Sequence, residues 1–112
     1  EKELGMGSRL SSEKLGDLIN FVKRNWIFDE EKYPDLKGRN HQERRIFAVR
    51  HILEHQMKSL GQLAEIIQDC EHGGNFNEQK AKDLLVKMFK NTLRLPDLLG
   101  MSADELLAGF MN

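Results

Sequence analysis

The sequence predicts an all-α protein, a bundle of four helices in one domain, and three observations support this fold class. Apolar residues recur in long stretches at the three- and four-residue spacing of a buried helix face. Residues that cap helix N-termini precede these stretches, and glycine or proline interrupts the chain between them. We find no stretch with the alternating pattern of a strand. The length, 112 residues, is that of a single domain.

The first helix is predicted to begin at Ser11 or Ser12, either of which can cap it. Its apolar residues follow the spacing of one buried face: Leu15, Leu18, Ile19, Val22 and Trp26. The ten residues before it contain two glycines and no periodicity. We therefore expect residues 1–10 to be a loose arm and residues 11–112 to form the domain.

A second, long helix is predicted after the loop that contains Pro34 and Gly38. Asn40 followed by Glu43 is a variant of the capping box that opens helices. Seven apolar residues then fall within about 40° of one line at 100° per residue, and we expect them to face the core. They are Ile46, Val49, Leu53, Met57, Leu60, Ala64 and Ile67. The glycine pair at positions 73 and 74 is expected to end this helix.

Two further helices complete the predicted bundle. The third opens near Asn75 and Glu78, and Pro96 predicts an end or a kink just before it. Ser102 and Glu105 form a full capping box that begins a short fourth helix. The inner face of the third helix is expected to consist of Ala81, Leu84, Leu85, Met88, Phe89 and Thr92.

Composition excludes several classes of function. Lys and Arg number 17 and Asp and Glu number 18, so the chain lacks the excess positive charge typical of a general nucleic-acid binder. No apolar run approaches the ~20 residues of a membrane span. The single cysteine, Cys70, cannot form an internal disulfide and suits a reducing compartment. We expect a cytoplasmic protein with neither nucleic acid nor membrane as a partner.

The stretch His51–His55 reads H-I-L-E-H, the inverted order of a zinc-peptidase motif. Histidines at i and i+4 lie on the same side of a helix and can reach one ion. A catalytic zinc site needs a third protein ligand and an open water position. His72 lies about five turns further along the same helix and cannot complete the site. We interpret His51 and His55 as solvated or interface side chains, with an adventitious or oligomer-bridging metal site as an alternative.

Two other stretches resemble a known family. Residues 58–65 read K-S-L-G-Q-L-A-E, and residues 92–105 read T-L-R-L-P-D-L-L-G-M-S-A-D-E. They resemble E-E-L-G-E-L-A-E and L-L-R-L-A-D-E-L-G-I-D-L-E-E, which are typical of MazG-like nucleoside triphosphate pyrophosphohydrolases. The resemblance implies a MazG-like bundle with one long central helix, assembled through its helices into a dimer or tetramer. It also implies Mg²⁺-dependent hydrolysis of nucleoside triphosphates.

This sequence departs from the family at the metal ligands. The acidic residues that hold Mg²⁺ in the family align here with Lys58, Ser59 and Gln62 on the long helix, and with Leu84 and Lys87 on the next. Mg²⁺ prefers carboxylate and phosphate oxygen, whereas a protonated lysine cannot ligate it and repels it. We therefore expect no catalytic residue, no metal ligand and no cofactor. The predicted function is that of a degenerate MazG-like domain, a non-catalytic oligomeric binding or regulatory protein.

Two alternative functions remain open. One is an active pyrophosphohydrolase that holds Mg²⁺ at an atypical acidic site near Glu65. The other is a structural interaction module without a small ligand. Self-association is expected in any case, because the long helix carries apolar residues outside its main line that a small bundle cannot bury. These are Phe47, Ile52, Leu63 and Ile66.

The resemblance also suggests a ligand site. It places Lys58 and Lys87 in one cleft, where two ammonium groups would attract the phosphate of a nucleotide or another anion. Gln62, Glu65 and His55 complete the predicted ligand-binding set. The alternative is that the cations of the third helix are its solvated side. Those cations are Lys87, Lys90 and Arg94.

Overall fold

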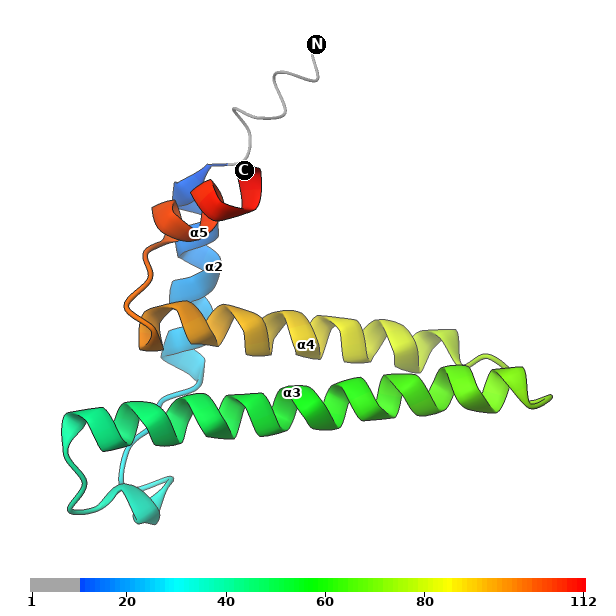
Figure 1. The fold of residues 1–112 in the computed structure, drawn as a ribbon, viewed down its shortest axis with the longest axis horizontal. Coiled ribbons are helices and arrows are strands. Elements are labelled where there is room, and N and C mark those ends of the chain that lie inside the picture. The colour runs from blue at the N-terminus through cyan, green and yellow to red at the C-terminus, as the bar shows by residue number, and fades with distance from the viewer. Residues whose placement is uncertain (1–10) are drawn as a thin grey trace, which may run out of the picture. The chain divides into compact units, whose positions relative to one another are not determined.

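The computed structural model describes residues 11–112, and within them all regular structure is helical. The elements are α2 (Ser12–Asn25), the 3-10 turn η1 (Pro34–Leu36), α3 (His41–Glu71), α4 (Glu78–Leu98) and α5 (Ala103–Met111) (Figure 1). The predicted all-α class with four α-helices is confirmed for these residues. The predicted arm, residues 1–10, lies outside the described residues. Across residues 11–112, no helix has both the length and the apolar composition that a membrane crossing requires.

By its internal contacts the chain divides into two compact units. We call residues 38–92 the hairpin unit, since they contain α3 and most of α4. Within the described residues the terminal unit consists of residues 11–37 and 93–112, and it contains α2, η1, α5 and the last turns of α4.

In the hairpin unit, α3 and α4 run antiparallel and side by side (Figure 1). The predicted capping box is confirmed: the Glu43 amide donates to Asn40 Oδ1 at 2.8 Å, and the Asn40 amide donates to Glu43 Oε1 at 3.0 Å. At the other end Gly73 adopts φ 94°, a left-handed conformation that glycine takes without strain. A side chain at Gly74 would lie 2.8 Å from the carbonyl oxygen of Asp69, so only glycine fits there.

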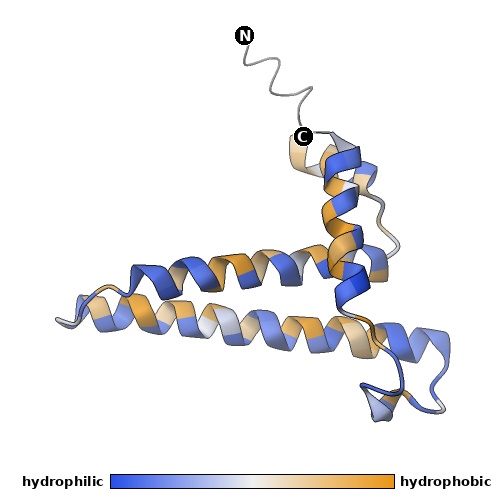
Figure 2. Ribbon diagram, turned by 180° about the vertical axis from the view of Figure 1, so that it is seen from behind, coloured by the Kyte–Doolittle hydropathy of each residue, from blue (hydrophilic) through white to orange (hydrophobic). Residues whose placement is uncertain are grey.

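The prediction of which residues of α3 face the core is wrong. Five of its seven residues are exposed by 45% or more: Ile46, Leu53, Met57, Leu60 and Ile67. The buried residues of α3 lie on another line, Ala48, Ile52, Ser59 and Ile66, on the same side as Gln56, whose amide binds α4. The hydrogen bonds of Gln56 to Met88 and Thr92 mark where α4 lies against α3, and a single neighbouring helix covers only a narrow seam. Figure 2 shows apolar segments recurring along both helices.

Two expectations for α4 also need correction. Leu84 is buried as expected, but Leu85, Phe89 and Thr92 of the expected inner face are exposed. The helix does not end before Pro96 but continues to Leu98. Proline removes one backbone donor, and the helix ends within a turn of it. Met101 then donates its amide to the Pro96 carbonyl at 2.8 Å.

In the terminal unit α2 packs against α5. Ile19, Val22 and Leu93 form its buried cluster, and Leu15, Ala103 and Leu106 pack against them. Ser11 caps α2 by accepting from the Lys14 amide at 3.2 Å. Ser102 and Glu105 form the capping box predicted for the last helix. Local sequence signals therefore fix both helix starts.

Candidate functional site

The hairpin has two faces of opposite character. Seen along a helix axis, each residue is rotated by 100° from the one before it. Measured in that sense, the exposed apolar residues of α3 and of α4 lie roughly 120° from the buried residues of the same helix. Antiparallel helices seen from one end turn in opposite senses, so these two lines fall on the same side of the hairpin. We call this side the apolar face. It consists of Ile46, Leu53, Met57, Leu60 and Ile67 of α3 with Leu85, Val86 and Phe89 of α4.

The opposite side, the polar face, carries all the residues of the predicted ligand site. Lys58, Glu65 and His55 of α3 and Lys87 of α4 are exposed there, and Gln62 is half-buried. Among the described residues, neither lysine makes a hydrogen bond or an ion pair, and no interaction joins them. The structure thus places the predicted set on one side of the hairpin without linking its members.

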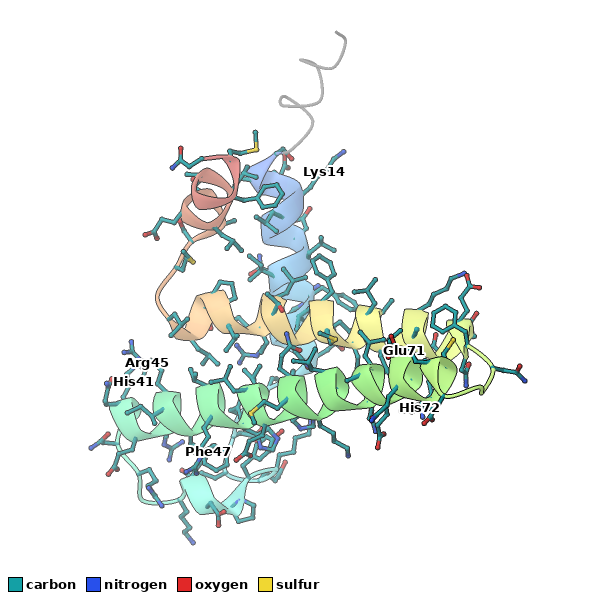
Figure 3. The ribbon with its side chains drawn as sticks, turned by 45° about the vertical axis from the view of Figure 1, so that its right-hand side comes forward. Lys14, His41, Arg45, Phe47, Glu71 and His72 are labelled. Carbon is teal, nitrogen blue, oxygen red and sulfur yellow. The ribbon has the colours of Figure 1, made fainter. Side chains whose placement is uncertain are left out.

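The two histidines of the H-x-x-E-H stretch do form a close pair on the polar face. His51 Nε2 and His55 Nε2 are 3.1 Å apart, and the two ring centroids are 4.7 Å apart. The ring of Phe47 stacks on His51, with centroids 5.9 Å apart and planes 12° from parallel. Figure 3 shows Phe47 on the side of α3 away from α4. Within residues 11–112, no three side chains of His, Cys, Asp and Glu gather as a group that could hold a metal ion.

Burial lowers the pKa of His51, and the neighbouring His55 lowers it further, while Glu54 acts in the opposite direction. The unfolded chain therefore takes up a proton at His51 more readily than the folded chain does. It follows that the free energy of unfolding falls as the pH decreases through about 6.5, the ordinary histidine value.

His51→Gln should therefore reduce the loss of stability between about pH 7.5 and pH 5.5. Urea unfolding at both pH values measures this loss for the wild type and the variant, and an NMR titration of the His51 ring reports its pKa directly. Equal losses of stability in the two proteins would contradict the prediction.

A buried amide network joins α3 and α4, and sequence reasoning missed it. Gln56 donates to the Met88 carbonyl at 3.2 Å and to Thr92 Oγ1 at 2.9 Å, and it accepts from Asn91 Nδ2 at 2.9 Å. Asn91 is only 5% exposed. Buried amides are satisfied by such partners and fix the register of two helices. The only sequence signal was Asn91 itself, a polar residue between the expected inner face of α4 and the charged side of that helix.

The alternative that Arg94 belongs to the solvated side of its helix is wrong. It is 6% exposed in the terminal unit, where its Nε donates to the Trp26 carbonyl at 2.8 Å. Its guanidinium carbon lies 5.3 Å from the centre of the Phe28 ring. The contact with an aromatic face and the hydrogen bond to a carbonyl offset part of the cost of removing a guanidinium from water. The aromatic residues after α2 were the sequence signal for this contact.

Asp97 balances the charge of this buried arginine. Its two carboxylate oxygens lie 3.7 Å from Arg94 Nη1 and 3.2 Å from Lys23 Nζ. Burial lowers the pKa of Arg94, while Asp97 and Tyr33 act to raise it. Arg94 Nη1 is buried and makes no hydrogen bond within the described residues. An open pocket of ≈ 390 Å³ next to this cluster is lined by Asn20, Lys23, Arg24, Ile27 and Arg94.

Comparison of the chain with models of known protein families, with curated proteins and with solved structures gives no significant match. The resemblance to MazG-like proteins therefore stays a prediction, as do the Mg²⁺-related expectations that depend on it.

Proposed function

We propose that this protein is a non-catalytic, self-associating helical protein that acts by binding, and that two copies join through the apolar faces of their hairpins. The observation that carries this proposal is the exposure of that face. Met57 is 70% exposed and Leu85 63%, and the other six side chains of the face are between 45% and 58% exposed. Contiguous apolar surface of this kind is rare on a protein that works alone.

The area of the apolar face fits a second copy. A large apolar side chain presents about 150–250 Å² when fully open, so each of these half-exposed residues leaves on the order of 100 Å² in water. Eight of them amount to roughly 800 Å², about what one partner contributes to a standard protein interface. Covering one hairpin with another would make a four-helix bundle, a form that two-helix units commonly adopt.

The apolar line of α3 is also symmetric about its own midpoint, which lies between Gln56 and Met57. Ile46 and Ile67 are equally far from that midpoint, and so are Leu53 and Leu60. A two-fold axis through it would run the two copies of α3 antiparallel, with Ile46 against Ile67 of the second copy. Self-complementary pairing of this kind is what a symmetric dimer requires.

Charge favours the same antiparallel arrangement. The first half of α3 is net positive, with Arg44, Arg45 and Arg50 against Glu43 and Glu54. Its second half is net negative and ends in Asp69 and Glu71 without a basic residue in the last turn. Cations near a helix N-terminus and anions near its C-terminus both oppose the helix dipole. An antiparallel second copy would set each charged end beside the opposite one and relieve this repulsion.

Sedimentation of the purified chain tests the proposal. We expect a species of twice the 13.0 kDa monomer mass at micromolar concentration. A monomer throughout that range would refute it, and the variant that isolates the apolar face is described in the Discussion.

The proposal also predicts no turnover. Purified protein should release no pyrophosphate from nucleoside triphosphates in the presence of Mg²⁺ or Mn²⁺, because lysine, serine and glutamine replace the carboxylates that the family chemistry needs. Turnover that Glu65→Ala abolishes would favour the active alternative.

If the polar face binds anions, nucleotide should raise the melting temperature, and Lys58→Glu or Lys87→Glu should remove the shift. No shift with any nucleotide would favour the interaction module.

A further inference from the structure

The His51–His55 pair has a geometry that the proposed self-association does not use. The two residues lie one helical turn apart on the polar face, away from the apolar face, and their Nε2 atoms are directed at one another at 3.1 Å. Two imidazole nitrogens adopt this distance in two situations. They either share one proton in a hydrogen bond, or they approach a common ion.

The distance fits a common ion well. Nitrogens bound to one ion at about 2.0–2.1 Å lie roughly 2.9–3.4 Å apart for ligand angles between 90° and the tetrahedral value. The rings are tilted by 59° rather than stacked, so both nitrogens can approach one point from different directions. Contact with the Phe47 ring holds the plane of His51 and reduces the freedom that binding would otherwise remove.

Two charged side chains lie near the pair along α3. Imidazole ligates a metal through a ring nitrogen that carries no proton. Glu54 stands between the two histidines in sequence and adds negative charge beside them, while Lys58, one turn on, adds positive charge. The two side chains therefore act in opposite directions on a bound dication.

The geometry points to a binding site for a borderline transition-metal dication, Zn²⁺, Ni²⁺ or Cu²⁺, held by His51 Nε2 and His55 Nε2. Neutral imidazoles suit these ions, whereas Mg²⁺ requires oxygen ligands. Two protein ligands leave the remaining positions to water or to a donor from another molecule. With two protein ligands the ion would exchange readily, and the site differs in kind and in location from the Mg²⁺ site that the family resemblance implies.

Calorimetric titration of the full, untagged chain with Ni²⁺, Zn²⁺ and Cu²⁺ tests the site. We expect one ion per chain, the tightest binding for Cu²⁺, and no binding of Mg²⁺ at this site. His51→Gln and His55→Gln should each weaken binding by about tenfold or more, since even outer-shell changes weaken metal sites 10–100-fold. Glu54→Gln should weaken binding by a smaller factor, and Lys58→Gln should strengthen it.

The chain supplies its own matched controls. His41→Gln and His72→Gln change the other two histidines, one near each end of α3, and Cys70→Ser removes the thiol. All three variants should bind as the wild type does, and circular dichroism should show that every variant remains helical. Equal binding by the wild type and His51→Gln, or loss of binding in His41→Gln or His72→Gln, would overturn the proposal and leave the pair as a hydrogen bond.

Discussion

Leu60→Glu should convert the dimer into a monomer of 13.0 kDa at concentrations where the unchanged chain is paired. Leu60 lies near the midpoint of the apolar line and is 54% exposed, so a carboxylate there costs little in the monomer. In the dimer two such charges would be buried among apolar side chains, at a cost of several kcal/mol. Sedimentation velocity at micromolar concentration measures the change.

Gln62→Glu is the matched control for this variant, because it adds the same charge two residues away on the polar face. It should sediment as the unchanged protein does. If both variants remain dimeric, or both dissociate, the apolar face is not the interface.

Cross-linking separates the antiparallel arrangement from a parallel one. In a Cys70→Ser background, a mixture of Leu53→Cys and Leu60→Cys chains should form a disulfide-linked pair on mild oxidation. Neither chain should do so alone, because identical positions of antiparallel helices would lie about 10 Å apart along the axis, beyond the reach of a disulfide. Parallel helices would give the reverse pattern.

Arg94→Ala should lower the free energy of unfolding by about 2–4 kcal/mol. The change removes the hydrogen bond to the Trp26 carbonyl, the contact with the Phe28 ring and most of the packing of a nearly buried side chain. It also leaves a carbonyl and the Asp97 carboxylate with fewer partners. Denaturant unfolding monitored by Trp26 fluorescence measures the loss.

Two variants divide this effect into its parts. Arg24→Ala removes an exposed arginine of the same pocket and should change stability by less than about 0.5 kcal/mol. Arg94→Met restores apolar volume but not the hydrogen bond, so its stability should lie between that of Arg94→Ala and the wild type. A loss for Arg94→Ala no larger than that for Arg24→Ala would show that the cluster does not stabilise the fold.

Helix number and helix starts could be predicted from the sequence because they depend on neighbours in the chain. A capping box needs only a side chain and a backbone amide three residues apart, and those at Asn40 and Ser102 are both present. The H-x-x-E-H spacing likewise brought His51 and His55 together through the pitch of one helix. The partners of Gln56 could not be predicted, because they belong to another helix 32 or more residues away.

The sequence by itself determined an all-helical chain with one long, amphipathic central helix, but only the tertiary structure decided which side of that helix is buried. Periodicity identifies an apolar line without saying what covers it. In α3 the line of Ala48 and Ile52 is buried, and the more regular line of Leu53 and Leu60 stays in water. Arg94 is buried for the same physical reason: burial depends on the contacts that a folded neighbour offers, and these do not follow from the polarity of the residue.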